Sequence, residues 1–518
     1  MKSPAHRSPP RTGGPKPTEE QQAVMDAIRA GVKSLKVEAG AGTGKSTTAT
    51  MIARTKPRER GILTVFNRLM ADSSQKDLVG TGCRASTLHS IAYRSGAAEP
   101  YKQRINMRLP ARLAASKAGV TGAAKAGDVR LTQVAVGYLL INWVARYCQS
   151  ADDVLNVRHF PRRTLFDNLN VEQTKRAVDD KRWFDSLCDS LATGLIEPAR
   201  RLWTLMSDPS LADMPSSHDV YLKLYVMGQP TIDADYVILD EAQDANPIMQ
   251  QYMALAAGQG AQAIYVGDSH QQLYSWRGAV DAMKSVHADA SLPLTHSFRF
   301  GPPVAEVANA ILGSMIGTDF QLVGAGGPSS IVDDMDTPSA VICRTNAAAI
   351  ETALALMEDG VKCGLCMDPQ TVKRDVDALE RFAEGGQSDD WRFCHFMHYG
   401  ELREACAAGI LPDFKILVDV IDAHGFAEAR ELLMRLAVGK SMEAIRSARV
   451  ETMLLTGHAS KGLQFDHVLL GDDFQSPKTD EEMNILYVAA TRARKTLCLG
   501  DSEAADEIRS AVNSRPSA

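Results

Sequence analysis

Two short stretches of the chain carry side chains that could act on a polyphosphate. The first, residues 39–46, reads AGAGTGKS and follows the alternating apolar and polar run 34–38. Its glycines would let the backbone approach a phosphate, and the helix expected over 47–55 would direct its positive end at it. Lys45 supplies a mobile charge for the outer phosphates, and Ser46 offers a hydroxyl to a magnesium ion. This strand–turn–helix pattern indicates a nucleotide site.

The second stretch is an apolar strand, 236–239, that ends in two adjacent acids, Asp240 and Glu241. Such a pair suits metal-assisted phosphoryl transfer. Asp240 would hold magnesium through its water shell, and Glu241 would orient and deprotonate the attacking water. Gln271 follows the next strand, 263–266, and could sense the terminal phosphate.

Two arginines, Arg299 and Arg492, lie in a different part of the chain from the phosphate loop. An arginine that reaches the phosphates from a second domain would couple hydrolysis to domain closure. The pattern therefore predicts a phosphate site that is completed by arginines of a second domain.

The elements that must position these groups are strands with polar carboxyl ends. Strand 62–66 runs into Asn67, and a further candidate strand ends at Thr87, shortly before His89. Open α/β sheets bind their ligands at the carboxyl ends of the strands. Ahead of them, Thr18 and Gln21 form a helix-capping box, and its position makes Gln21 a candidate for contacting adenine.

At 518 residues the chain is long enough for about three or four folding units. The predicted fold is α/β, with two parallel-sheet core domains that each carry a helical insertion. We expect the following division: a disordered basic tail, 1–17; the first core domain, 18–95 and 228–291, with its insertion, 96–227; the second core domain, 292–367 and 450–505, with its insertion, 368–449; and a C-terminal tail, 506–518.

Composition narrows the function classes. Hydrophobic residues make up 45% of the chain and charged residues 23%, and no apolar run approaches the length that spans a bilayer. Nine scattered cysteines indicate a reducing compartment, so we expect a cytoplasmic protein, in a bacterial or phage setting. The net charge of −6 means that any nucleic-acid site must be a local basic surface.

Three features each allow two interpretations. The basic residues of 102–130 could be a solvated surface or a phosphate-contacting face, and they are Lys102, Arg104, Arg108, Arg112, Lys117, Lys125 and Arg130 against the lone acid Asp128. Cys363 and Cys366, with Cys394, His395 and His398 further on, could bind a metal or pack in the core of a strand over 361–367. Tyr274 and Trp276, beside Arg277, could stack on unpaired bases or pack in a core.

Taken together, the motifs resemble those of UvrD/Rep-like helicases of superfamily 1. They occur in the same order along nearly the whole chain, as AGAGTGKS, TLHS at Thr87, DEAQD at Asp240, VGDSHQQLYSWRGA at Val266, SFRFG at Ser297, HASKGLQFD at His458 and YVAATRAR at Tyr487. LTHSFRFG and TVFNR look most similar to the F-box DNA helicase branch. We expect no F-box region in this chain, and a ubiquitin-ligase role is not carried over.

The resemblance implies two RecA-like core domains, ATP and Mg²⁺ in the cleft between them, and single-stranded DNA across the top. The implied catalytic residues are Lys45, Glu241, Gln271, Arg299 and Arg492, and Ser46 and Asp240 would bind the metal. Nucleotide would contact Gln21, Ala39, Gly40, Ala41, Gly42, Thr43, Gly44, Lys45, Ser46, Thr47, Phe298 and Gln464. DNA would contact Phe66, Asn67, Thr87, His89, Tyr274, Trp276, Arg277, Arg344, Asn346, His458 and Lys461.

Two positions depart from the family pattern. Gln464 stands where the family usually has a glutamate, at a position expected near the ribose. Asn484 stands where an arginine is common. Neither change touches a group needed for hydrolysis, whereas alanine at position 39 is itself common in the family.

The function implied is an ATP-dependent translocase and helicase that moves 3′ to 5′ on single-stranded DNA, in replication, repair or recombination. Its partners would be single-stranded DNA and single-strand/duplex junctions, with a recombinase or single-strand-binding protein as further candidates and with the monomer as the working form. One alternative is a translocase that strips recombinase from single strands. Another is a nucleotide-gated DNA-binding subunit of a nuclease or defence complex, and RNA is a minor alternative as the track.

Replacing the loop lysine separates nucleotide turnover from strand binding. We expect Lys45→Ala to abolish ATP hydrolysis and translocation, because the outer phosphates lose their cationic partner, and to leave measurable single-strand binding. Phosphate-release and strand-binding assays measure the two quantities. A Lys45→Ala protein that still unwinds duplex would contradict the prediction.

Overall fold

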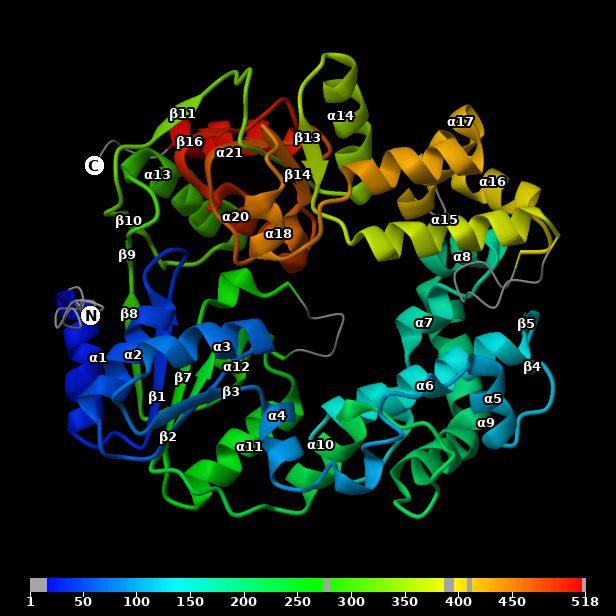
Figure 1. The fold of residues 1–518 in the computed structure, drawn as a ribbon, viewed down its shortest axis with the longest axis horizontal. Coiled ribbons are helices and arrows are strands. Elements are labelled where there is room, and N and C mark those ends of the chain that lie inside the picture. The colour runs from blue at the N-terminus through cyan, green and yellow to red at the C-terminus, as the bar shows by residue number, and fades with distance from the viewer. Residues whose placement is uncertain (1–15, 274–279, 386–395, 408–411, 515–518) are drawn as a thin grey trace, which may run out of the picture.

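The computed structural model describes residues 16–273, 280–385, 396–407 and 412–514. Two six-stranded sheets with only parallel pairings lie at the centres of two lobes (Figure 1). This arrangement confirms the predicted α/β class. Tyr274, Trp276, Arg277, Cys394 and His395 lie outside the described residues.

The first sheet has the order β3-β2-β6-β7-β1-β8. Its strands are β1 (Ser34–Ala39), β2 (Gly61–Thr64), β3 (Cys83–Ser86), β6 (Tyr236–Asp240), β7 (Gln262–Gly267) and β8 (Ala290–Leu294). The central strands β6 and β7 are buried at every position, because helices cover both faces of the sheet.

Alternate residues of β6 enter two separate cores of the first lobe. Tyr236 and Ile238 pack with helices α1 (Glu19–Arg29), α2 (Lys45–Thr55) and α3 (Arg68–Asp77). Val237 and Leu239 pack with α4 (Leu88–Arg94), α10 (His218–Met227) and α11 (Pro247–Gly258) on the other face. The apolar run in the sequence thus fills both layers of a three-layer lobe.

The second sheet has the order β11-β16-β15-β12-β14-β13. Its strands are β11 (Ser330–Val332), β12 (Ala340–Cys343), β13 (Cys363–Leu365), β14 (Thr452–Thr456), β15 (Phe465–Leu470) and β16 (Ala493–Cys498). One face packs against α13 (Pro302–Ala310), α20 (Asp480–Ala490) and α21 (Glu503–Asn513), and the other against α14 (Asn346–Glu358) and the second insertion. The short strands β9 (His296–Ser297) and β10 (Val323–Gly324) pair beside the crossover between the lobes.

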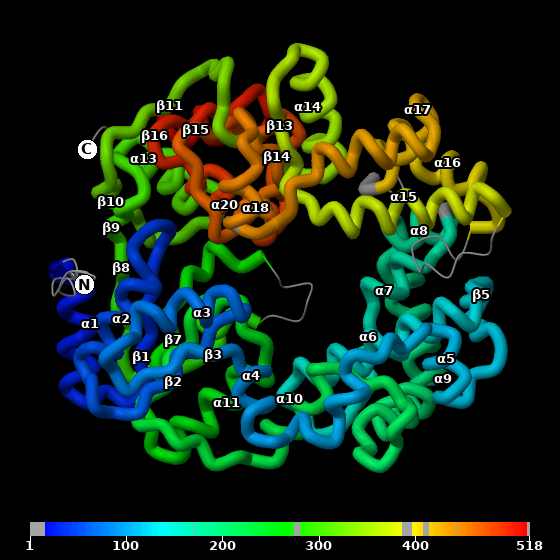
Figure 2. The backbone as a smooth tube through the Cα atoms, in the orientation of Figure 1, coloured from blue at the N-terminus to red at the C-terminus, as the bar shows by residue number. Residues whose placement is uncertain are grey.

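Each lobe is interrupted by an insertion, and both insertions project to the same side of the molecule, at the right of Figure 2. The first contains α5 (Ala111–Lys117), α6 (Gln133–Gln149), α7 (Arg162–Phe166), α8 (Val171–Asp179) and α9 (Lys181–Ser207), with its own core around the fully buried Trp143. It also contains an antiparallel hairpin, β4 (Ala124–Ala126) and β5 (Val129–Leu131), that the predicted helical unit lacked. The second contains α15 (Pro369–Ala383), α16 (Tyr399–Ala407), α17 (Pro412–Leu436) and α18 (Met442–Ser447). Among the described residues, no helix has the length and apolar character that a membrane span requires.

The structure corrects two predicted boundaries. β8 pairs with β1 through Leu294, so residues 292–294 lie in the first sheet rather than the second unit. Most of the predicted tail 506–518 is helical, because α21 runs to Asn513 and buries Ile508 completely. Ala504, Ala505 and Ile508 lie on one face of that helix at spacings of three and four residues, which makes an apolar stripe.

Two of the open sequence interpretations also become clearer. Arg104 is buried and donates to the carbonyls of Met214, Asp208, Leu205 and Met206, so it cannot belong to a phosphate-contacting face. It instead satisfies carbonyl groups at and beyond the carboxyl end of α9. Cys363 begins β13, as predicted for a strand residue, and its thiol donates to the carbonyl of Ala353.

Truncating Ile508 tests whether α21 belongs to the core of the second lobe. We expect Ile508→Ala to lower the free energy of unfolding by about 2–5 kcal/mol, because a buried aliphatic side chain is lost. Urea titration followed by circular dichroism measures the change. Ser510→Ala, on the exposed side of the same helix, is the control, and equal effects of the two changes would contradict the assignment.

Candidate nucleotide site and nucleic-acid interface

The phosphate loop joins β1 to α2 at the carboxyl edge of the first sheet. Gly42 and Gly44 have φ of +77° and +85°, a region in which side chains other than glycine are strained. A Cβ atom at Gly42 would lie only 2.6 Å from the Cβ atom of Arg299, which comes from the second lobe. Glycine is therefore required here both for the turn and for the approach of the other lobe.

Lys45 lies over the loop that precedes it. Its ammonium donates to the carbonyls of Ala39 and Gly40, at 2.9 and 3.2 Å, and lies 3.9 Å from the carboxylate of Asp268. The loop thus places a cation at the end of β1, where the predicted phosphates would lie. Ser46 begins the exposed face of α2 beside it.

Gln21 is buried against the phosphate-loop helix, with an exposed fraction of 4%. The predicted capping box is confirmed, because Gln21 and Thr18 exchange hydrogen bonds between their side chains and backbone N–H groups. The side-chain amide of Gln21 also donates to the hydroxyl of Thr48 at 3.1 Å. This amide fixes α1 against α2, and its contact with adenine stays a prediction.

Asp240 and Glu241 are adjacent at the end of β6, with Asp240 buried and Glu241 partly buried. Burial and the neighbouring charge of Glu241 raise the pKa of Asp240 to about 7. Burial alone would raise the pKa of Glu241 as well, but the charges of Lys461 and Lys45 outweigh that effect, so its pKa is lowered. Glu241 also has a left-handed backbone, φ +53°, and the amide of Gln243 donates to its carboxylate. An ionised carboxylate held in a strained, fixed position is typical of a catalytic base.

The donor set at this edge fits a magnesium ion. Mg²⁺ prefers hard oxygen ligands and is usually held by one or two carboxylates together with phosphate oxygens. Asp240 supplies a carboxylate, and Ser46 supplies a hydroxyl at the start of α2. A cation would also relieve the repulsion that raises the pKa of Asp240.

The two arginines of the second lobe are placed differently. The guanidinium of Arg299 donates from Nη1 to the carbonyl of Thr491 at 2.8 Å, while its buried Nε has no hydrogen-bond partner among the described residues. Arg492 is 1% exposed and donates to the carbonyls of Val488 and Leu463. Arg299 therefore keeps a donor for a further acceptor, whereas Arg492 braces the end of α20, and its phosphate contact stays a prediction.

Two predicted nucleotide contacts from the second lobe are exposed. Phe298 is 51% exposed, and its backbone N–H donates to the carbonyl of Gly42 at 2.9 Å, so its ring is held beside the phosphate loop. Gln464 is exposed at the start of β15, where it lines a small pocket with Ile445 and Arg494.

The predicted DNA residues of the first lobe gather at the ends of β2 and β3. Phe66 is 45% exposed. Asn67 and Thr87 cap α3 and α4, so their backbone positions are fixed by the helices that follow. His89 pairs with Asp219 of α10 at 2.8 Å, which ties this edge to a helix on the far face of the first sheet. The sheet places all four residues at one edge, as the sequence predicted.

The predicted DNA residues of the second lobe differ in their surroundings. Asp473 accepts the N–H groups of Arg344 and Thr345, both at 2.8 Å, and thereby fixes the start of α14, where Asn346 is exposed. His458 lies 3.6 Å from Glu481.

Lys461 lies in the seam between the lobes, with only 11% of its side chain exposed. Its ammonium pairs with Asp244 and donates to the carbonyl of Gln271 at 2.6 Å. The attraction of the buried carboxylate draws the ammonium toward the seam, and the contact of Lys461 with DNA stays a prediction.

Four site residues lie within the quoted motifs but received no role in the sequence analysis, namely Gln243, Asp244, Asp268 and Tyr487. Asp268 is 4% exposed and accepts from the side-chain amide of Gln271 at 2.6 Å. It follows β7 directly, as Asp240 ends β6, so the rule that polar residues at strand ends form the site would have found it. Tyr487 gave no such signal, since it lies within an apolar helix of the other lobe.

Comparison with known families agrees with this geometry. Residues 20–277 match the family described as AAA domain, and residues 452–499 match the UvrD-like helicase C-terminal domain. Together with the motif order, these matches support a UvrD/Rep-like helicase of superfamily 1. The resemblance inferred from the motifs is thereby confirmed.

Relatives similar to this helicase-family chain include two eukaryotic proteins. It is 27% identical to F-box DNA helicase protein 1 of Schizosaccharomyces pombe, over 94% of this chain and 57% of that protein. It is 26% identical to F-box DNA helicase 1 of Gallus gallus, over 94% of this chain and 49% of that protein. The chain therefore spans about half the length of these relatives.

The exposed ring of Phe298 can be tested as an adenine-stacking group. We expect Phe298→Ala to weaken the binding of a fluorescent adenine nucleotide about fivefold to tenfold, the lower range for loss of an aromatic–base stack. Equilibrium fluorescence titration measures the dissociation constant. Phe66→Ala, an equally exposed phenylalanine of the first lobe, should leave it unchanged; if both variants lose affinity alike, Phe298 has no special role at the base.

Proposed function

We propose that this chain is an ATP-dependent DNA helicase that translocates 3′ to 5′ along single-stranded DNA. The observation that carries the proposal is the composite site: Lys45, Asp240 and Glu241 come from the first lobe, and Arg299 reaches the same loop from the second. The match to the UvrD-like helicase C-terminal domain and the names of the two relatives support the choice of DNA as the track.

In this proposal the first lobe supplies the groups that act on ATP. Lys45 binds the outer phosphates, and Gly42 and Gly44 allow the loop to wrap them. Glu241 takes a proton from the attacking water, while Gln243 keeps its carboxylate in place. Asp240 and Ser46 would hold a magnesium ion, which when bound would supply positive charge to the phosphates.

The second lobe senses the state of the phosphates. The partnerless Nε of Arg299 offers a donor for an oxygen on the transferred phosphoryl group. Binding and release of that contact would close and open the cleft. Single-stranded DNA would lie across the exposed residues at the ends of β2 and β3 and at the start of α14, and cleft movement would advance it.

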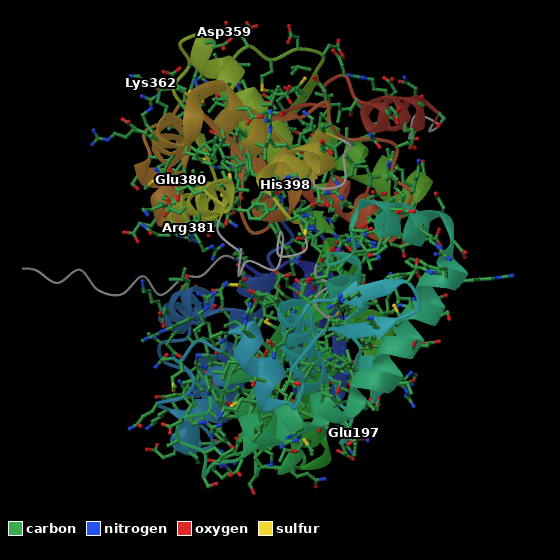
Figure 3. The ribbon with its side chains drawn as sticks, turned by 90° about the vertical axis from the view of Figure 1, so that its right-hand side faces the viewer. Glu197, Asp359, Lys362, Glu380, Arg381 and His398 are labelled. Carbon is green, nitrogen blue, oxygen red and sulfur yellow. The ribbon has the colours of Figure 1, made fainter. Side chains whose placement is uncertain are left out.

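Replacing the catalytic base tests the chemistry. We expect Glu241→Gln to lower the turnover number for ATP at least about 100-fold, because general base catalysis is lost, with little change in nucleotide affinity. Steady-state hydrolysis with and without single-stranded DNA measures it. Glu197→Gln is the control, because Glu197 is exposed on α9 of the first insertion, at the lower end of the molecule in Figure 3. Among the described residues, its carboxylate pairs with the nearby Arg200.

Hydrolysis and unwinding by the wild-type protein test whether it is a motor on single-stranded DNA and in which direction it moves. Hydrolysis should be accelerated by single-stranded DNA, and duplex with a 3′ tail should be unwound in preference to duplex with a 5′ tail. If single-stranded DNA does not change the rate of ATP hydrolysis, the proposed DNA motor is refuted. A preference for duplex with a 5′ tail would reverse the proposed polarity.

A further inference from the structure

One face of α20 in the second lobe contacts the segment 268–273 of the first lobe. The side-chain amide of Asn484 donates to the carbonyl of Gln272 at 3.1 Å. One turn further along, the hydroxyl of Tyr487 donates to the carboxylate of Asp268 at 3.4 Å. Residues three apart lie on the same side of a helix, so both side chains reach across the cleft together.

Tyr487 also reaches the phosphate loop. Its hydroxyl accepts the backbone N–H of Ala41 at 3.2 Å, so a single phenol joins the loop to Asp268. Burial raises the pKa of this phenol well above its usual range, so it stays neutral and able to donate. The residue is fully buried, and opening of the cleft would strip the hydroxyl of both partners.

The segment 268–273 is held to the catalytic carboxylate from its other side. The side-chain oxygen of Gln243 accepts the N–H of Asp268 at 2.9 Å, and its amide donates to Glu241. The side chain of Gln272 donates to the backbone carbonyl of Gln243 at 3.0 Å. A displacement of this segment would therefore act directly on the group that supports Glu241.

The same segment leads toward the predicted DNA contacts, since Tyr274 follows Leu273 in the sequence. Lys461 of the second lobe adds a further hydrogen bond, to the carbonyl of Gln271. The second lobe thus contacts the segment at positions 268, 271 and 272. Movement of α20 during cleft closure would displace the whole segment 268–273, because the side chains of Gln271 and Asp268 are also hydrogen-bonded to each other.

We propose that Asn484 and Tyr487 are positioning residues that couple nucleotide binding to single-strand binding through the segment 268–273. The inference rests on the proposed function and adds the contacts that carry the coupling. Asn484 stands where an arginine is common in the family. The hydrogen bond from its shorter side-chain amide to Gln272 is therefore specific to a chain with asparagine at this position.

The coupling can be measured as a ratio of two dissociation constants for single-stranded DNA, with and without a non-hydrolysable ATP analogue and Mg²⁺. We expect Tyr487→Phe and Asn484→Ala each to reduce this ratio about threefold to tenfold, the range for one lost hydrogen bond. DNA affinity without nucleotide should change less than about twofold. In both variants, the turnover number in the presence of DNA should fall while the KM for ATP stays unchanged.

Tyr252→Phe is the matched control, because this phenol is also buried, in α11 on the far face of the first sheet. It should leave the ratio unchanged. If the ratio for the wild-type protein differs clearly from 1 and both test variants keep that same ratio, the inference is overturned and the proposed function is left intact. A wild-type protein with no DNA-stimulated hydrolysis and a ratio of one would overturn the proposed function and the coupling with it.

Discussion

The structure depends on keeping two adjacent carboxylates ionisable, the buried Asp240 and the partly buried Glu241. Adjacent like charges withdrawn from water are costly unless opposite charges lie nearby. The first lobe supplies Lys45, and the second supplies Lys461 and the arginines near α20. Neither lobe alone provides this compensation, so the electrostatics of the catalytic centre require both. That requirement links the chemistry to the relative position of the lobes.

A steric constraint acts at the same place. The lobes approach so closely that a methyl group at Gly42 would collide with Arg299. The absence of a side chain thus serves the turn, the phosphates and the interface together. Similar economy is seen at Gln243, which supports Glu241 with one end of its amide and Asp268 with the other. Because each of these groups contacts two parts of the site, a change in the bound phosphates would displace both parts together.

Charge in the sequence was a poor guide to exposure. Arg104 and Arg492 are both buried, and each uses its guanidinium to satisfy backbone carbonyl groups near the end of a helix. Lys461 similarly faces a buried acid rather than a surface. Long basic side chains can cap carbonyls or pair internally as readily as they can bind phosphate, and local sequence does not distinguish these outcomes.

The sequence by itself determined the α/β class, the strand–loop–helix around Lys45 and the polar residues at the strand ends. These features are local: they follow from alternation, glycine content and the position of a polar residue after an apolar run. The partners of Tyr487 and Asn484, the inward position of Lys461 and the place of α21 in the core depended on tertiary structure. Each of them involves contacts between distant parts of the chain, including parts on opposite sides of a cleft. No local pattern records those contacts, because packing within and between the lobes decides which side chains meet.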